Sequence, residues 1–333
     1  MAEAAAIDLH ALRAAQPRFS GLEAGHRACQ GCGQSLAARL VTEAAGPDVI
    51  VANATGCLEV FTTSWPQTAW RIPWIHSLFA NTAAVASGIE AALKKQGRAT
   101  KVMAFAGDGG TFDIGFQALS GMIERGHNVL FVCFDNEGYM NTGVQRSGST
   151  PHAASTTTSP AGVHSTGKRH LKKDVLQIVA AHHLPYAATA SVAFPRDLYA
   201  KVRRAIGVEG PTFLQILSPC PLGWRHDSEA TIEVARLAVE TGFFPVVEIE
   251  RGYVTGVMPI RQRKPIVEYL KLQGRFRHLL GDDPHAVQER AHLQALADRN
   301  IEVYGLLGER PSVTDTTGIA LVHRGASVEG AAL

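Results

Sequence analysis

The sequence has few aromatic residues, few cysteines and little net charge. Its 333 residues include 7% aromatic residues and five cysteines, and 32 Lys and Arg nearly balance 30 Asp and Glu. A small, odd number of cysteines argues against a secreted disulfide framework and leaves metal or redox chemistry open. Near-neutral charge without a basic stripe argues against nucleic acid or an anionic membrane surface as the main partner.

Targeting and membrane segments are lacking too. The first ten residues, MAEAAAIDLH, have no cationic stretch before an apolar run, so no signal peptide is expected. Apolar runs such as 129–134 reach about a third of the length that a membrane span needs. We expect a cytoplasmic protein without a membrane span, because a reducing compartment suits unpaired cysteines.

Strand-like and helix-like patterns alternate over most of the first 220 residues. Apolar side chains at steps of three or four residues favour helices, and continuous apolar runs favour strands buried on both faces. The expected strands are 48–52, 101–106, 129–134, 186–191 and 212–217, and the expected helices are 81–95, 112–123, 173–183 and 195–208. This order predicts an α/β fold with a doubly wound, mostly parallel sheet and helices on both faces.

Changes in composition and hydrophobic pattern along the chain suggest three segments. Residues 1–20 are an N-terminal segment, 21–224 the sheet domain, and 225–333 a C-terminal helical extension that packs on this domain or on partner subunits. In the extension, 228–241 and 265–280 look helical and 244–253 looks β-like. The regular pattern also stops between 135 and 170, and irregular stretches of this length are usually functional.

A glycine-rich turn, Gly107-Asp108-Gly109-Gly110, follows one expected strand, and Asn136 follows the next. Alone, Gly-Asp-Gly could be an ordinary turn. Neighbouring parallel strands, however, bring their carboxyl ends together at the ligand crevice. Carboxylate, amide and backbone oxygens suit Mg²⁺, and the glycines let the chain approach a diphosphate closely. The spacing therefore predicts a magnesium-diphosphate site and resembles the thiamine-diphosphate signature.

Four cysteines are placed to share one metal centre: Cys29 and Cys32 in a Cys-x-x-Cys pair, Cys57, and Cys220. Four thiolates suit zinc or an iron–sulfur cluster, and the spacing alone does not choose between them. The nearby thiamine signature favours iron–sulfur. Cys133 lies within an apolar strand and is interpreted as a small buried hydrophobe.

A series of motifs follows in one order along the chain: 26–33, 54–60, 77–79, 107–109, 139–145, 187–191, 211–213 and 269–276. Together they resemble the thiamine-diphosphate-binding β subunit of the 2-oxoacid:ferredoxin oxidoreductase family, in the pyruvate synthase branch. The similarity runs through most of the chain, and several linked motifs make it specific.

The resemblance implies three cofactors: thiamine diphosphate, Mg²⁺ and a 4Fe–4S cluster. The cluster would be held by Cys29, Cys32, Cys57 and Cys220. The magnesium ligands would be the Asp108 carboxylate, the Asn136 side chain and the Gly138 carbonyl, although pyruvate-type members often have Thr at the position of Asn136. Asn141 and Thr142 would lie beside the thiazolium as catalytic residues. The remaining cofactor-binding residues would be Thr55, Gly56, Cys57, Gly107, Gly109 and Gly110.

The implied reaction is the oxidative decarboxylation of a 2-oxoacid, by default pyruvate, with coenzyme A to acyl-CoA and CO₂. Electrons would pass through the cluster to ferredoxin or an NAD-linked acceptor. Family members bind thiamine diphosphate between two thiamine-type domains, and this chain contains one. The resemblance thus implies a partner α subunit, together with small ferredoxin-type and linker subunits.

Alternatives remain at this stage. The substrate could be an aromatic 2-oxoacid such as phenylglyoxylate with NAD as acceptor. The chain could be a non-catalytic zinc-binding assembly module, or a thiamine enzyme without electron transfer, although the last class usually carries both thiamine domains in one chain. A basic cluster at Lys168, Arg169, Lys172 and Lys173 could meet coenzyme A phosphates or form a solvated face. His26 and His76 could orient a ligand or be structural.

Overall fold

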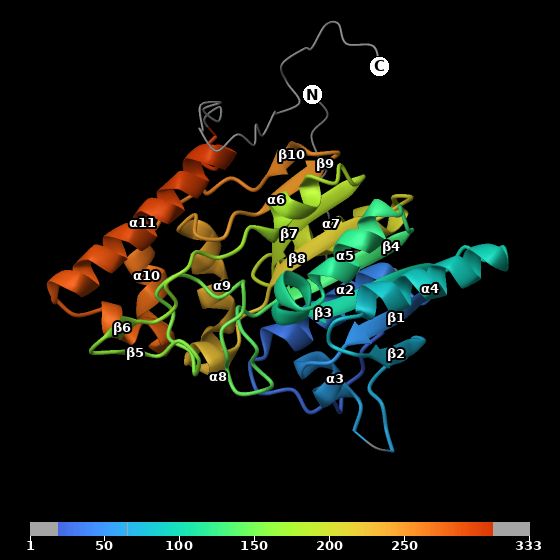
Figure 1. Ribbon diagram of the computed structural model, residues 1–333, viewed down its shortest axis with the longest axis horizontal. Helices are drawn as coiled ribbons and strands as arrows, with labels where there is room; N and C mark the ends of the chain where they lie inside the picture. The colour runs from blue at the N-terminus through green and yellow to red at the C-terminus, as the bar shows by residue number, and fades with distance from the viewer. Residues whose placement is uncertain (1–18, 65, 309–333) are drawn as a thin grey trace, which may run out of the picture.

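The computed structural model describes residues 19–64 and 66–308. At its centre is an eight-stranded sheet with the order β10-β9-β7-β8-β4-β3-β1-β2 (Figure 1). The six strands from β7 to β2 are parallel, and β9 and β10 are antiparallel to their neighbours. The bounds are β1 Val49–Ala54, β2 Trp74–Ser77, β3 Lys101–Gly107, β4 Val129–Asp135, β7 Tyr186–Ser191, β8 Thr212–Leu217, β9 Val247–Glu250 and β10 Tyr253–Val257.

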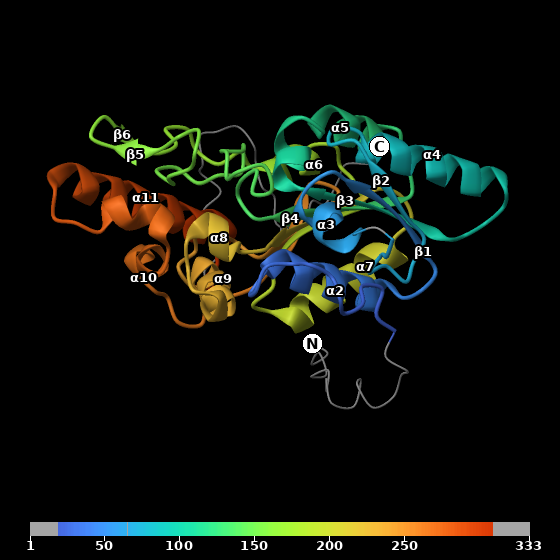
Figure 2. The same cartoon turned by 90° about the horizontal axis from the view of Figure 1, so that it is seen from below.

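Helices cover both faces of this sheet (Figure 2). One face packs against α4 (Thr82–Lys95), α5 (Phe116–Glu124) and α6 (Val175–Ala180), and the other against α2 (Gly33–Ala45), α3 (Cys57–Thr62) and α7 (Pro195–Gly207). Successive residues of a central strand enter opposite cores: Phe131 lies in the first and Leu130 in the second. This double burial explains the continuous apolar runs and confirms the predicted α/β fold.

The carboxyl ends of four neighbouring strands meet at one edge of the sheet. Thr55 follows β1, Asp108 follows β3, Asn136 follows β4 and Ser218 follows β8. All four strands run in the same direction, and open α/β sheets bind ligands in the crevice at this edge. The topology therefore gathers the predicted cofactor residues from four separate parts of the chain.

The C-terminal residues build a third core around Trp224, Tyr269 and Phe276. Its helical elements are α8 (Pro221–Trp224), η2 (Ser228–Ala230), α9 (Thr231–Glu240), α10 (Ile266–Lys271), η3 (Gly274–Leu279) and α11 (Pro284–Tyr304). The stretch 244–253, expected to be β-like, contains β9, and β10 begins at its end; both strands extend the main sheet, with Ala187 opposite Ile249. The division into segments stays a prediction, and 1–18 and 309–333 lie outside the described residues.

The helices of the structure differ from the expected ones in three places. The expected helix 112–123 is split into the π-turn η1 (Gly109–Asp113) and α5, because the turn wraps the Gly-Asp-Gly loop. The expected helix 265–280 is split into α10 and η3. The 21-residue helix α11 was not anticipated from the sequence. Among the described residues, no helix has the length and apolar character required to cross a membrane.

The stretch after β4 is irregular apart from a two-strand hairpin, β5 (Ala161–Gly162) with β6 (Ser165–Thr166). Two of the four clustered basic residues, Lys168 and Lys172, contact groups within the chain, whereas Arg169 is exposed and the Lys173 side chain is 39% exposed. Lys168 is 2% exposed and donates to the carbonyl oxygens of Gly148 at 3.1 Å and Thr150 at 2.5 Å. Lys172 is held between two buried carboxylates described below. The ammonium groups of Lys168 and Lys172 therefore form interactions within the chain.

Candidate cofactor site

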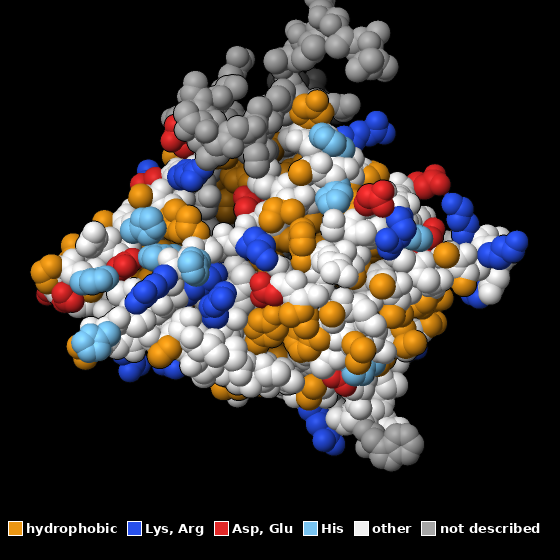
Figure 3. Space-filling view, in the orientation of Figure 1, with side chains coloured by type: hydrophobic (Ala, Val, Ile, Leu, Met, Phe, Trp, Pro, Cys, Tyr) orange, Lys and Arg blue, Asp and Glu red, His pale blue; other side chains and the backbone are white. Residues whose placement is uncertain are grey.

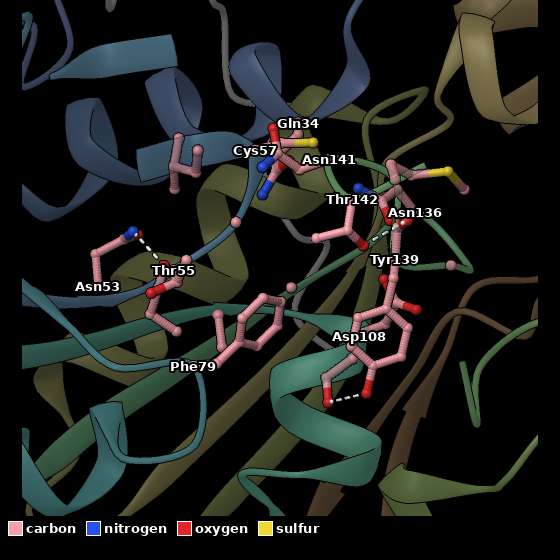
Figure 4. A pocket seen from close by; sticks show the side chains of 18 residues that line it. Gln34, Asn53, Thr55, Cys57, Phe79, Asp108, Asn136, Tyr139, Asn141 and Thr142 are labelled. Carbon is pink, nitrogen blue, oxygen red and sulfur yellow. Dashed lines mark hydrogen bonds between the residues drawn. The ribbon is translucent and has the colours of Figure 1, made fainter. Parts of the chain in front are cut away.

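A cleft opens at the carboxyl edge of the sheet, between the ends of β1, β3 and β4 (Figure 4). Nearly all the predicted cofactor residues line it: Thr55, Gly56, Cys57, Gly107, Asp108, Gly109, Asn136, Gly138, Asn141 and Thr142. Gly110 does not line the cleft. It packs against the backbone of Phe79, where an added Cβ would lie 3.2 Å from the Phe79 carbonyl oxygen. The cleft thus unites segments that are far apart in the sequence.

Asp108 lies at the floor of the cleft and is 1% exposed. Burial, and then the nearby Asp135 carboxylate, raise the pKa of Asp108 well above its usual range. Ser147 Oγ donates a hydrogen bond of 2.5 Å to Asp108 Oδ2, which leaves Oδ1 directed toward Asn136. A nearby cation stabilises the ionised form of such a buried carboxylate, because it compensates for the solvation that the charge has lost.

Tyr139 covers the turn that carries Asp108. Its hydroxyl donates to the Gly109 carbonyl and to Asp113 Oδ2, both at 3.2 Å. A Cβ at Gly109 would lie 2.3 Å from the Tyr139 ring, so only glycine allows this approach. Asp113 in turn accepts from the Gly148 amide at 2.9 Å, which ties the long loop to the same turn.

Three oxygen-bearing groups converge at Asn136. One terminal atom of its side-chain amide lies 2.9 Å from Asp108 Oδ1 and 2.9 Å from the Gly138 carbonyl oxygen. If that atom is nitrogen, it donates to both oxygens; if it is oxygen, the three oxygens face one another around a common point. Adjacent ligands of an octahedral Mg²⁺ lie about 2.9 Å apart, given Mg–O distances of about 2.0–2.1 Å. The spacing and chemistry of these groups fit that ion.

The upper wall of the cleft carries Thr55, Asn141 and Thr142. Thr55 Oγ1 is 2.8 Å from His76 Nε2, so His76 braces a cleft residue instead of lying in the core. Asn141 and Thr142 are exposed on a tight turn, where Thr142 Oγ1 donates to Gln145 Oε1 at 2.6 Å. Their exposure leaves both side chains available to a ligand in the cleft.

Gln34 is a lining residue that the sequence did not single out. Its side chain is 4% exposed, and its Oε1 is buried without a hydrogen-bond partner in the described part of the chain. A buried oxygen without a partner is costly in a folded protein. The cleft residue Gln34 therefore has an unused acceptor, and its position two residues after Cys32 is the signal that could have identified it.

The four predicted cluster cysteines approach one another beside this cleft. Cys32 and Cys220 precede α2 and α8 as N-cap residues, and Cys57 is the first residue of α3. Burial, followed by the other three thiols, raises the pKa of Cys57 to about 12. Burial also raises the pKa of Cys220 to about 11, where Cys32 and Cys29 add to the shift. These mutual effects show that the thiols form one group.

The thiols are not arranged around a single ion. Within residues 19–64 and 66–308, no three His, Cys, Asp or Glu side chains form a group that could hold one metal ion. Cys133, as predicted, is buried within β4 and belongs to the apolar core.

A buried charge network lies around the turn 135–138, and the sequence did not reveal it. Lys172 Nζ is 2.8 Å from both Asp135 Oδ2 and Glu137 Oε1, and Arg275 Nη2 is 2.7 Å from Glu137 Oε2. Gln215 Nε2 donates to Asp135 Oδ2 at 2.7 Å. Two cations thus balance two carboxylates, which satisfies the requirement that buried charges be paired.

Comparisons with known proteins agree with the fold and the cleft. The family model for the C-terminal TPP-binding domain of thiamine pyrophosphate enzymes matches residues 54–216. Pyruvate synthase subunit PorB of Methanocaldococcus jannaschii is 53% identical over 281 residues, spanning 82% of this chain and 94% of that protein. Ketoisovalerate oxidoreductase subunit VorB of Pyrococcus horikoshii is 50% identical over 275 residues, spanning 80% of this chain and 88% of that protein.

Among solved structures, a 2-oxoglutarate:ferredoxin oxidoreductase from Magnetococcus marinus superposes with a TM-score of 0.52. The alignment has 22% identity and covers 65% of this chain and 79% of that chain, and it supports the fold alone. Fold, cleft and family model together define a thiamine-diphosphate-binding domain. The chain belongs to the 2-oxoacid:ferredoxin oxidoreductase family, as the PorB-like β subunit. It is an enzyme component, one subunit of a multi-subunit 2-oxoacid oxidoreductase.

Proposed function

We propose that this subunit binds magnesium and thiamine diphosphate in the cleft and a 4Fe–4S cluster beside it, for the oxidative decarboxylation of pyruvate to acetyl-CoA and CO₂. The observation that carries the proposal is the convergence of Asp108, Asn136 and Gly138 in a cleft whose wall also holds Cys57. One cofactor site thereby adjoins the start of the other. Such proximity is what electron transfer between two centres needs.

The magnesium site follows from charge and geometry. Asp108 Oδ1, the Asn136 amide oxygen and the Gly138 carbonyl would supply three oxygen ligands, leaving positions for diphosphate oxygens and water. When bound, thiamine diphosphate supplies a nucleophilic carbon and an electron sink for the loss of CO₂. The chain's own contribution is to hold the diphosphate through the metal and the Gly107–Gly109 backbone. Asn141 and Thr142 would contact the reacting end of the cofactor.

A cluster is favoured over zinc because the four cysteines lie beside a thiamine-type cleft, where the reaction needs an electron acceptor. The thiols of Cys29, Cys32, Cys57 and Cys220 are near enough to influence one another's pKa values. A 4Fe–4S cluster is held by four cysteines. Gly223 N also donates to Cys220 Sγ at 3.3 Å, the kind of contact that tunes a cluster's reduction potential. The zinc-binding assembly module is the alternative, and metal analysis separates the two.

The α subunit is proposed to cover the open side of the cleft and to complete the thiamine site. Large apolar side chains are exposed around the cleft, with Leu78 72% and Ile114 51% exposed. Figure 3 shows hydrophobic side chains gathered over the η1 region and beside α4 and β2. Exposed apolar patches on this scale commonly mark protein interfaces. The small ferredoxin-type and linker subunits, and a ferredoxin or NAD-linked acceptor, complete the proposed assembly.

Pyruvate is the proposed substrate because the first relative named above is a pyruvate synthase subunit. The similarity of VorB gives a second candidate, the branched 2-oxoacid ketoisovalerate, since 50% and 53% identity hardly separate the two relatives. The five free thiols and an oxygen-sensitive cluster favour a cytoplasmic location.

The test is the purified multi-subunit complex assayed with a panel of 2-oxoacids, coenzyme A and a dye acceptor under anaerobic conditions. The panel contains pyruvate, ketoisovalerate, 2-oxoglutarate and phenylglyoxylate. The proposal expects the highest kcat/KM with pyruvate and dependence on both thiamine diphosphate and coenzyme A. A clear preference for ketoisovalerate would assign the second candidate, and thiamine-independent turnover would reject both.

A further inference from the structure

The motif 269–276 lies in the C-terminal extension, yet one of its side chains reaches the cofactor side of the molecule. Arg275, in η3, is 2% exposed, and its guanidinium is inserted between the metal-ligand turn and α8. An arginine at this depth is unusual, because burying a charge is costly unless every donor finds a partner. Its contacts therefore indicate what it does.

The first contact fixes the metal-ligand turn. Arg275 Nη2 donates to Glu137 Oε2 at 2.7 Å, and Glu137 lies between Asn136 and Gly138, the two proposed ligands. Glu137 has a φ of 62°, in the left-handed region that a glutamate rarely adopts, so its neighbours must hold it there. The ion pair with Arg275 lies where it can fix this conformation.

The second contact reaches the cysteine side. The Arg275 guanidinium carbon lies 3.8 Å from the centroid of the Trp224 ring. Trp224 ends α8, which Cys220 caps at its N-terminus, and the Trp224 backbone amide donates to the Cys220 carbonyl at 2.8 Å. The Trp224 indole N–H also donates to the Asn136 carbonyl at 2.6 Å. One guanidinium and one indole therefore join the Asn136 turn to the Cys220 turn.

The guanidinium itself has little freedom. Arg275 Nε donates to Gln273 Oε1 at 2.8 Å, and Nη2 also donates to the Tyr269 hydroxyl at 3.1 Å. Gln273 and Tyr269, which lie close to Arg275 in the sequence, therefore hold the planar guanidinium so that it faces both turns. A lysine could supply the charge but neither the fork nor the stacked plane.

We propose that Arg275 is a positioning residue that fixes the Asn136–Gly138 turn and the Cys220 turn relative to each other, so that the metal site and the cluster site are positioned together. The proposal rests on the proposed function, since it assumes that both turns bind cofactors. It gives a role to the C-terminal extension, whose contribution the proposed chemistry leaves unexplained. Removal of the fork should disturb both sites at once.

The test compares the purified multi-subunit complex carrying wild-type chain, Arg275→Lys, Tyr269→Phe and the control Arg204→Lys. Arg204 makes a similar set of contacts, with Glu248 at 2.8 Å, Glu250 at 2.6 Å and the Tyr186 ring at 4.9 Å, but at the far edge of the sheet. The readouts are the Mg²⁺ concentration for half-maximal binding of thiamine diphosphate and the EPR spectrum and midpoint potential of the reduced cluster.

Arg275→Lys is expected to weaken Mg²⁺-dependent binding by about tenfold or more, as loss of a residue that orients metal ligands does. It is also expected to alter the cluster's EPR signal and potential. Tyr269→Phe, which removes one anchor of the fork, should shift both readouts less and in the same direction, and Arg204→Lys should shift neither. A folded Arg275→Lys or Tyr269→Phe complex with wild-type values, or a change at one site alone, overturns the proposal. A wild-type complex without thiamine-dependent activity would instead reject the proposed function, and this inference with it.

Discussion

The backbone amide of Gly33 donates to the carbonyl oxygen of Pro219 at 3.1 Å. Each residue is next to a cysteine, Cys32 on one side and Cys220 on the other, so this one bond brings two distant segments of the proposed cluster site into contact. A Cβ on Gly33 would lie 2.8 Å from that oxygen, which restricts the position to glycine. The fold itself therefore brings the segments of Cys32 and Cys220 together.

Cys57→Ser should remove the cluster and spare the thiamine site. Cys57 is one of the four proposed cluster ligands, whereas the magnesium ligands lie on other strands. We expect the loss of most of the chain's iron and of electron transfer, with thiamine diphosphate binding reduced by less than about tenfold. Iron analysis and thiamine titration of the complex measure both.

The matched control is Cys133→Ala, which removes a thiol of the β4 core and should leave the iron content unchanged. If Cys133→Ala lost the iron, or if Cys57→Ser lost thiamine and iron equally, the assignment of the four ligands would be wrong.

Asp108→Asn should abolish magnesium-dependent binding of the cofactor. The substitution keeps the size of the side chain but removes the only carboxylate among the three proposed ligands. We expect affinity for Mg²⁺ with thiamine diphosphate to fall by about a hundredfold or more. Isothermal titration of the complex gives the two affinities.

Asp113→Asn is the comparison, because Asp113 accepts hydrogen bonds from Gly148 and Tyr139 behind the turn without facing the ligand group. Its effect should be clearly smaller. Similar losses in both variants would indicate that Asp108 acts on the turn and not as a ligand.

Lys172→Met should strongly destabilise the fold. It leaves Asp135 and Glu137, 0% and 3% exposed in their side chains, without their shared cation. Breaking a buried pair by removing one partner costs about 3–5 kcal/mol. Urea unfolding measures the loss. The neighbouring Lys173→Met should cost less than about 1 kcal/mol, because Lys173 is 39% exposed and lies 3.6 Å from Asp113; equal losses would argue against the network.

Lys101 should make stability depend on pH in the alkaline range. Burial lowers the pKa of Lys101 from 10.5 to about 8, and its ammonium contacts Asn128 and the Val208 carbonyl. Between pH 8 and 10.5 the unfolded chain keeps this proton and the folded chain does not. The free energy of unfolding should therefore rise with pH there, by at most about 1.4 kcal/mol per pH unit from this group.

The check is the difference in stability between wild type and Lys101→Met, followed by urea unfolding from pH 7 to 10.5. This difference isolates Lys101 from Lys168, whose pKa burial also lowers to about 8. An unchanged difference across that range would show that Lys101 keeps its ordinary pKa.

The sequence predicted the central strands well for a physical reason. The strands 101–106, 129–134 and 212–217 are largely apolar because both faces are covered, and their predicted ends differ from the structure by at most one residue. The rule that parallel strands share their carboxyl edge then located Asp108 and Asn136 together. Local sequence patterns were sufficient to predict the elements in which buried positions recur regularly along the chain.

The same patterns could not reveal contacts between distant segments. Arg275 pairs with Glu137 across the fold, and neither residue carries a local signal of its partner. Helix α11 escaped notice because few of its side chains are buried, namely Ala286, Leu293, Ala297, Ile301 and Tyr304. The β-like stretch 244–253 indicated β9 but not the extent of β10, which is a short edge strand with one buried residue among five.

The most direct test of the central claim is iron and zinc analysis of the anaerobically purified full chain, with its visible spectrum before and after reduction. Iron–sulfur clusters absorb visible light and zinc does not. The proposal expects about four iron atoms per chain and a broad visible absorption that bleaches on reduction. Stoichiometric zinc without iron, in a colourless protein, would contradict it.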